Sequence, residues 1–354
     1  MKSWWWVLLA LGCTGRPAPA PDAGVVHRYP QLPNGGGAVL RESTLVSIAL
    51  GPETGHHAFV RWLAESGWLV ERGSEYGIER VSVAASVDLA APTADLIDAD
   101  IRAMLRARGV SPGNVYVVWG PPGLAIVDRY GNRTCFSNPG TGYHEHLDEE
   151  DVAYVVVPGC PPRFSAQLEQ HEAMHMDAAR LVIDALTNPS PRNAPAFALS
   201  DPTVGWSSLG PEAGDFCWGR LIERDGHTLQ RVWSNAAIAR REEPCVPAPA
   251  GATAFGFEVE PAGRRTLSVG ERITLTVRGW SSGEVPDWPV QILYWSGDFT
   301  MQASLDKQLF NDGVSATLEL SVPFPVAKGT AGSILLRGLG ADDTPQWPVA
   351  FITR

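Results

Sequence analysis

The residues with the clearest chemical potential lie in one short stretch, His171-Glu172-Ala173-Met174-His175. Two histidines four positions apart lie on the same face of a helix, where their ring nitrogens can bind one metal ion, typically zinc. A glutamate directly after the first histidine can act as the general base that takes a proton from a water molecule beside the metal. The spacing therefore predicts a zinc site in which His171 and His175 are ligands and Glu172 is catalytic.

The stretch from Gln170 to Asn188 predicts one amphipathic helix that carries this motif. Both histidines fall within its apolar arc, whereas Asp177, Arg180 and Asp184 fall on its polar face. Neutral histidines on a buried face need partners, which a metal ion would supply; a pair of core histidines bonded to backbone carbonyls is the alternative. The apolar arc consists of Phe164, Leu168, Met174, Ala178, Leu181, Val182, Ala185 and Leu186.

The chain has 354 residues, of which 44% are hydrophobic, and this is enough for two globular domains. Its net charge of −11 argues against nucleic acid or an anionic membrane surface as a partner. Residues 1–13 predict a lipoprotein-type signal peptide, because a lysine and a short apolar run precede Cys13. Ala10-Leu11-Gly12-Cys13 resembles a bacterial lipobox with its first two residues exchanged. We therefore expect an exported protein anchored to the bacterial cell envelope by lipid on Cys13, with a plainly secreted protein as the alternative.

Four cysteines remain after Cys13, and an even number in an exported chain predicts two disulfide bonds. Their order along the sequence favours Cys135–Cys160 and Cys217–Cys245, although two other pairings are formally possible. Their spacing is unlike that of a zinc ribbon, so we do not expect cysteine ligands for a metal.

The rest of the sequence predicts a tether and two domains. Residues 14–38 are rich in Pro, Gly and Ala and form the tether. Residues 39–247 show the order β-α-β-α-β-β-β before the long helix, which is typical of an α/β or α+β domain. Residues 248–354 alternate apolar and polar positions between turn residues, which predicts an immunoglobulin-like β-sandwich.

Several short strings between Leu45 and Cys245 occur in an order that resembles an exported bacterial family of zincin-like metalloproteases. Members carry S-H-E-x-x-E-A-x-T-D-P on the central helix, E-x-G-D-x-C downstream and often a C-terminal sandwich. The resemblance implies a zincin-like α/β (α+β) domain with a C-terminal all-β sandwich domain. The matching strings are Glu75-Tyr76-Gly77, Tyr116-Val117-Val118, Pro121-Pro122-Gly123, Gly142-Tyr143-His144, Val152-Ala153-Tyr154, Asp201-Pro202, Gly205-Trp206, Glu212-Ala213-Gly214-Asp215-Phe216-Cys217 and Trp233-Ser234-Asn235.

The helix departs from the family pattern at the motif itself. Residues 183–189 match the x-E-A-x-T-D-P part, and in that register the family's His and Glu positions fall on Arg180 and Leu181. Neither residue can do the corresponding work. Either the helix has gained residues and the working motif is His171 to His175, or the family site has decayed. The polar position of Arg180 favours the first explanation.

The third zinc ligand is expected from the loop after the helix. The resemblance places Asp215 near the site, with Glu212 as the alternative, and a disulfide at Cys217 would hold their loop. A carboxylate pair that only caps backbone amides is the competing interpretation. His144 and His146 could also share a metal, but their acidic surroundings favour solvated side chains, and His56-His57 is likewise expected at the surface.

These features predict an exported zinc metallopeptidase that hydrolyses a protein or peptide substrate through a metal-activated water. The alternative is an inactive zincin-like surface lipoprotein whose sandwich domain binds a protein or a glycan. A serine hydrolase is not expected, because the sequence has no G-x-S-x-G motif.

Overall fold

The computed structural model describes the two folded parts of the chain. The predicted signal peptide with Cys13, most of the tether, and Asp201 and Trp206 lie outside the described residues. These are 29–52, 55–135, 142–160, 168–199, 212–261, 263, 265–283, 287–296, 301–311, 313–338 and 346–353.

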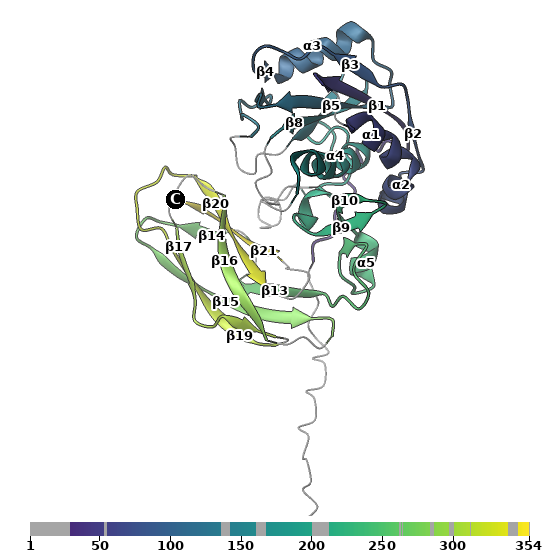
Figure 1. Ribbon diagram of the computed structural model, residues 1–354. Coiled ribbons are helices and arrows are strands. Elements are labelled where there is room, and N and C mark those ends of the chain that lie inside the picture. Colours follow the sequence, from purple (N-terminus) through teal and green to yellow (C-terminus); the bar gives the residue numbers. More distant parts are fainter. Residues whose placement is uncertain are drawn as a thin grey trace, which may run out of the picture.

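The first part is built on one largely parallel sheet, ordered β2-β1-β5-β8-β7, with β3 also paired to β1 (Figure 1). Within the described residues, β7 alone runs antiparallel to its neighbour, β8. All eight residues of β8 are buried, as expected for a parallel strand covered on both faces. The strands are β1 (Glu42–Leu50), β2 (Arg80–Val83), β3 (Val87–Leu89), β5 (Asn114–Pro122), β7 (Tyr143–Leu147) and β8 (Val152–Gly159).

Helices cover both faces of this sheet. On one face α1 (His56–Glu65), α2 (Trp68–Gly73) and α4 (Gln170–Thr187) share a core with β1, β5 and β8. On the other face α3 (Asp98–Arg108) buries Ile101 and Leu105 against the opposite side chains of the same strands. Two short elements complete this part, the strand pair β4 (Leu96–Ile97) with β6 (Ile126–Val127) and the 3-10 turn η1 (Ser74–Tyr76). The mixed α/β class is therefore confirmed.

The first helix of the predicted β-α-β-α-β-β-β order, expected over residues 57–69, is two helices in the structure, α1 and α2. Gly67 takes φ 76°, a left-handed conformation that ends α1 and redirects the chain into α2. The predicted helix from Gln170 to Asn188 is present as α4, and Pro189 lies just beyond its end.

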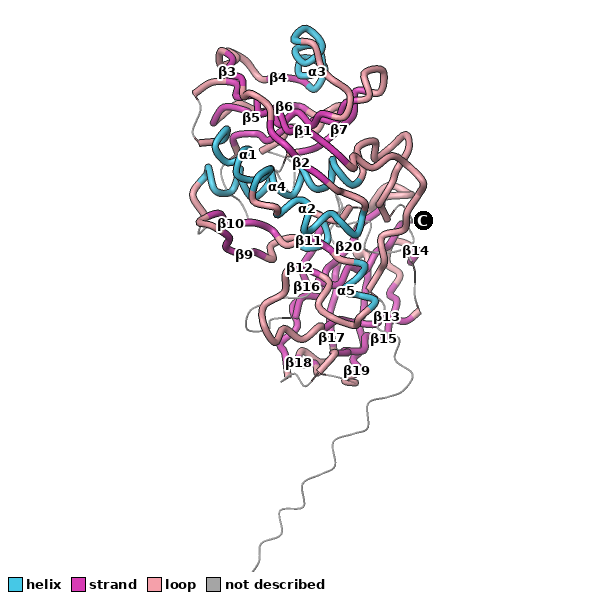
Figure 2. Tube along the Cα trace, turned by 90° about the vertical axis from the view of Figure 1, so that its right-hand side faces the viewer, coloured by secondary structure: helices cyan, strands magenta, loops and turns pink. Residues whose placement is uncertain are grey.

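A small, mostly β segment covers the side of α4 that faces away from the sheet. Both views place α4 between the sheet and the hairpin of β9 and β10 (Figures 1 and 2). Both predicted disulfides are confirmed: Cys217–Cys245 closes this segment and Cys135–Cys160 ties the end of β8 to the loop after β6. The elements are η3 (Asp215–Cys217), β9 (Leu221–Arg224), β10 (His227–Gln230), β11 (Val232–Trp233), α5 (Asn235–Ala239) and β12 (Cys245–Val246).

The second part is all β. Its strands form two sheets, ordered β13-β15-β19-β17 and β14-β21-β20-β16-β18, and in the described residues they pair only with one another. Alternate residues of β15 and β19 are buried, so each sheet turns one face to a common core. The strands are β13 (Phe255–Glu260), β14 (Arg265–Leu267), β15 (Arg272–Ser281), β16 (Trp288–Ser296), β17 (Gln302–Leu305), β18 (Leu309–Phe310), β19 (Ser315–Ser321), β20 (Ala331–Gly338) and β21 (Gln346–Thr353).

Tyr29 links the two parts. Its ring makes edge contacts with Trp233 of the first part and Trp280 of the second, at centroid distances of 5.4 and 4.9 Å. Its hydroxyl donates to the carbonyl oxygen of Phe255 at 2.8 Å. Among the described residues, no helix is long and apolar enough to cross a bilayer.

The predicted boundary between the domains can be tested by limited proteolysis. Residues 248–251 are exposed and join β12 to β13, so we expect a broad-specificity protease to cut there first and leave residues 255–353 folded. Mass spectrometry of the fragments and circular dichroism of the C-terminal piece check this. First cuts within β13 to β21 would contradict it.

Candidate functional site

The N-terminus of α4 is fixed by a capping bond: the backbone N–H of Glu169 donates to Oε2 of Glu172 at 2.9 Å. Glu172 therefore helps to start the helix that carries both motif histidines. A carboxylate has two oxygens, so this bond occupies only part of its capacity to accept protons.

Four histidines from three elements meet beside this turn. His171 and His175 come from α4, His56 begins α1 and His227 begins β10. Nδ1 of His56 lies 3.1 Å from Nε2 of His175. The ring of His175 lies 5.9 Å from that of His171 and 6.2 Å from that of His227, between centroids. The structure thus brings the two predicted ligands together with two histidines that the sequence analysis did not assign to the site.

Flat aromatic side chains hold the two closest rings. His56 stacks on Trp119 with centroids 4.2 Å apart and ring planes 3° apart. His175 stacks on Phe59 with the same 4.2 Å separation and an angle of 1°. Trp119 and Phe59 are both almost fully buried, so these surfaces do not move readily. The orientation of both imidazoles is therefore set by the core.

Burial, together with the positive charge that His56, His171 and His227 can carry, lowers the pKa of His175 to about 3. The ring is consequently neutral at pH 7 and keeps one nitrogen lone pair. A separation of 3.1 Å between two ring nitrogens fits an N–H···N hydrogen bond. It also fits two ligands of one tetrahedral zinc, which lie about 3.3 Å apart when each bond is ~2.0–2.1 Å. The donor set and its spacing therefore suit zinc.

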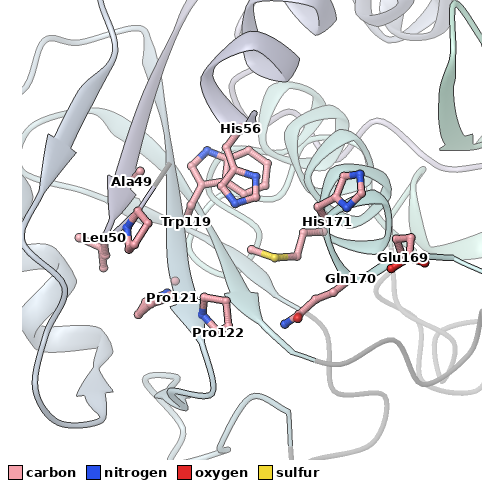
Figure 3. Close-up of a pocket in the computed structure, with 12 residues that line it drawn as sticks. Ala49, Leu50, His56, Trp119, Pro121, Pro122, Glu169, Gln170 and His171 are labelled. Carbon is pink, nitrogen blue, oxygen red and sulfur yellow. The ribbon is translucent and has the colours of Figure 1, made fainter. Parts of the chain in front are cut away.

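A pocket of about 340 Å³ opens next to these histidines (Figure 3). It lies at the carboxyl ends of β1 and β5. The strand order reverses between these two strands, because β2 lies on the far side of β1 and β5 on the near side. Open α/β sheets usually bind ligands at such a position. Figure 3 shows His56 and His171 on separate helices at this pocket, with Trp119 against His56. The remaining wall is largely apolar and includes Leu50, Pro52, Pro121, Pro122 and Met174.

Asp215 and Glu212, the predicted third ligand and its alternative, belong to a second cluster farther along α4. Their carboxylates and that of Asp184 each place an oxygen within 4.8 Å of the others, and in the described residues only this group of three does so. Asp215 accepts a hydrogen bond from Nη1 of Arg180 at 2.6 Å. Arg180 follows His175 by five residues, about 7.5 Å along the helix axis. The expected position of Asp215 beside the histidines is therefore corrected. Its carboxylate pairs with the guanidinium of Arg180 in the second cluster.

Arg180 is the cation of this acid cluster, defined here as Asp177, Asp184, Glu212 and Asp215. It donates to Oδ1 of Asp177 at 2.8 Å and lies 3.7 Å from Oδ2 of Asp184. The interpretation of Asp177, Arg180 and Asp184 as a polar outer face was wrong, since all three are buried. The segment from η3 to β10 covers that face, so these charges pair with one another instead of with water.

His144 was also misplaced by the sequence analysis. It lies in β7, is fully buried and contacts Oε2 of Glu212 through Nε2 at 2.7 Å. Burial lowers the pKa of His144, but the adjacent Glu212 carboxylate outweighs this and raises it to about 9. Burial likewise raises the pKa of Asp184, and it raises that of Asp215 to about 6 even though Arg180 acts in the opposite direction. The acid cluster is thus a closed charge network with two internal cations.

His56 and His227 are the site residues that the sequence analysis missed. His56 was expected at the surface, yet only about 5% of it is exposed. The available signal was topological: His56 follows the end of β1 and opens the next helix, where α/β sheets place functional groups. His227 lies in a segment with little regular pattern and gave no such signal.

Asp215→Asn should flatten the pH dependence of stability. A carboxyl with a raised pKa in the folded state stabilises the fold fully below its unfolded value of about 4, and this contribution is lost as pH rises through about 6. We therefore expect the Tm of the wild type to fall relative to that of the variant between about pH 4 and pH 7. Thermal scans at several pH values test this, with half-exposed Asp95→Asn as the control. Parallel wild-type and Asp215→Asn curves would refute it.

Arg180→Met should lower the free energy of unfolding by about 3–5 kcal/mol, because it leaves buried carboxylates without their cation. Arg41→Met, which breaks an exposed pair with Glu79, is the matched control and should leave stability nearly unchanged. Urea titration of both variants provides the measurement. Equal stability of Arg180→Met and wild type would show that the guanidinium does not neutralise the acid cluster.

Comparisons with known proteins add little to this geometry. No family model and no curated protein matches the sequence. Domains 4 and 5 of the S-layer protein SbsC are 13% identical over 29% of this chain and 53% of theirs, with a TM-score of 0.22. A conjugative transposon lipoprotein from Bacteroides eggerthii is 10% identical over 27% of this chain and 95% of its own, with a TM-score of 0.21. A lipoprotein from Bacteroides thetaiotaomicron is 18% identical over 28% and 81%, also with a TM-score of 0.21. TM-scores this low carry no conclusion, and the metalloprotease resemblance remains a prediction.

Proposed function

We propose that this protein is an exported zinc-dependent peptidase, held at the bacterial cell envelope through lipid on Cys13. The observation that carries the proposal is the 3.1 Å separation between Nδ1 of His56 and Nε2 of His175, within an H-E-x-x-H helix. His56, His171 and His175 would be the ligands, with His56 in the role first expected of Asp215. The two disulfides support export, since such bonds are typical of oxidising compartments.

His171 requires the smallest adjustment to join the other two. It is exposed in the first turn of α4, so its side chain can rotate without disturbing the core. His56 and His175 are buried and already oriented by Trp119 and Phe59. Three histidine ligands would leave one of the four coordination positions of zinc for water or substrate, as a catalytic zinc site needs.

Zinc, when bound, lowers the pKa of a water molecule and polarises a carbonyl group. The protein's own contribution centres on Glu172, whose carboxylate would take the proton from the attacking water and deliver it to the leaving amine. Its backbone position one residue after His171 suits this role. The bond from the Glu169 N–H holds one oxygen of that carboxylate, which limits its movement during proton transfer.

The pocket walls support a substrate with an apolar side chain next to the bond that is cleaved. Leu50, Pro121, Pro122 and Met174 offer apolar surface, and the volume of about 340 Å³ suits one side chain better than a whole folded domain. Peptide bonds are proposed because the metalloprotease resemblance favours them.

The zincin-like assignment is part of the same proposal. It is supported by a central helix that carries H-E-x-x-H and lies against a sheet. In the family's register the first histidine of the motif falls on Arg180, and Arg180 instead forms ion pairs with Asp177 and Asp215 of the acid cluster. This favours the explanation in which the working motif is His171 to His175. The rival is an inactive surface lipoprotein that binds a protein or a glycan.

Metal analysis of the purified protein separates the two functions. We expect about one zinc per chain, lost in His56→Gln and His175→Gln because two ligands hold zinc poorly. Glu172→Gln should keep zinc but lose peptidase turnover by about 10²–10⁴-fold, since only the proton acceptor is removed. The matched control is His146→Gln, because His146 lies in β7 and contacts Asp148 instead of the proposed zinc ligands. If the wild type holds no metal after it has been supplied with excess zinc, the peptidase proposal is wrong and the binding-protein alternative is favoured.

A further inference from the structure

A buried serine stands behind the histidine site and joins three side chains in a hydrogen-bonded chain. Ser47 lies in β1 and is completely buried. Its Oγ is 2.7 Å from Nδ1 of His57 and accepts a hydrogen bond from Nε1 of Trp119 at 3.0 Å. Nε2 of His57 lies 3.1 Å from Oδ1 of Asp88 in β3. The chain therefore runs from the surface, at Asp88, to the core, at Trp119.

The donor and acceptor at each step follow from the groups themselves. The Asp88 carboxylate can only accept, so Nε2 of His57 carries the proton between them. In the neutral ring Nδ1 is then an acceptor, and the Ser47 hydroxyl donates to it. The indole N–H of Trp119 can only donate, so it completes the chain at the serine oxygen. Every member is satisfied in one arrangement, which makes this a rigid unit.

This combination of serine, histidine and aspartate does not serve a nucleophile. A nucleophilic hydroxyl must reach its substrate, whereas Ser47 is fully enclosed in the sheet. Both ends of the Ser47 hydroxyl are also committed, one to Trp119 and one to His57. Of its two ends, the one that faces the histidine site is Trp119.

Trp119 connects the chain to the proposed metal centre. The same indole that donates to Ser47 presents its flat face to His56. His56 in turn places Nδ1 at 3.1 Å from His175. A rotation of the indole would break its bond to Ser47, so the serine fixes the plane on which His56 rests.

We propose that Ser47, His57 and Asp88 are positioning residues that orient His56 through Trp119. The inference rests on the proposed zinc site for its biological meaning, although the orientation itself is a property of the metal-free protein. Groups that hydrogen-bond directly to a metal ligand change metal affinity by about 10–100-fold when removed, and the lower end of that range is expected here because the three residues act through Trp119. None of the three would touch zinc or substrate.

The experiment compares two pairs of matched variants. Ser47→Ala removes the central hydroxyl, and its control is Ser43→Ala in the same strand, a buried serine whose Oγ has no hydrogen-bond partner among the described residues. Trp119→Phe removes the indole N–H, and its control is Trp233→Phe. Nε1 of Trp233 donates to the Pro30 carbonyl oxygen at 3.0 Å, the same length as the bond from Trp119 to Ser47. The Trp233 control loses the same kind of bond at another place, whereas the Ser43 control loses a buried hydroxyl that makes no hydrogen bond with the described residues and so isolates the contribution of the two bonds at Ser47.

The first readout is the ring ¹⁵N spectrum of His56 and His175 in the metal-free proteins, which reports the tautomer of each imidazole. We expect a single, unequal pair of ring nitrogen shifts for His56 in the wild type and both controls. In Ser47→Ala and Trp119→Phe the two shifts should converge as the ring loses its fixed orientation. The second readout is zinc affinity by chelator competition, in which both test variants should be weakened at least about tenfold and the controls less than about twofold.

The outcomes separate this inference from the proposed function. If His56 gives the same ring shifts in Ser47→Ala and Trp119→Phe as in their controls, the positioning role is wrong. If the wild type binds no zinc, the peptidase proposal fails, but the ring shifts still decide whether the serine chain orients His56. Equal zinc affinity in all five proteins would also overturn the positioning role.

Discussion

The burial of Arg180 within α4 is the constraint on which the rest of the first part depends. From Asp177 to Thr187 every residue of α4 is buried, because this half of the helix lies between the sheet and the hairpin and has no face left for water. Its charged residues must then find partners inside the protein, because an unpaired buried charge costs several kcal/mol. Arg180 meets this demand by engaging Asp177, Asp184 and Asp215 at once. The segment from η3 to β10 can close over the helix only because these charges compensate one another.

This closure divides α4 into two chemically different halves. The C-terminal half is sealed, and the carboxylates of Glu212 and Asp215 beside it pair with His144 and Arg180. The N-terminal half ends at the carboxyl edge of the sheet, where the pocket opens and the histidines gather. Asp215 therefore cannot serve both halves, although it lies close to the histidine motif in the resembling family's pattern. In the N-terminal half His175 stays neutral, because burial and the neighbouring histidines lower its pKa.

The sequence predicted what depends on local spacing and missed what depends on the crossing of distant segments. The H-E-x-x-H helix, both disulfides and the alternating strands follow from patterns within a few tens of residues. His56, in contrast, meets His175 across a separation of 119 residues, and no local pattern encodes that contact. The polar face of α4 was misread for a related reason. A helical wheel assigns charged residues to water by default, and it cannot see that another segment supplies their counter-charges.

The pairing of His56 with His175 illustrates why a site of this kind must be built by the core. Two imidazoles whose nitrogens approach to 3.1 Å cannot both be protonated there, so the contact needs a shared proton or a shared cation. A flexible surface pair would separate when both rings take up protons, at little cost. Here Trp119 and Phe59 hold the rings by stacking, and the pKa of His175, lowered to about 3, shows that the fold disfavours the charged form. Stacking on Trp119 and Phe59 thus holds the two ring nitrogens at a preset distance, which suits either a shared proton or the metal ion of the proposed function.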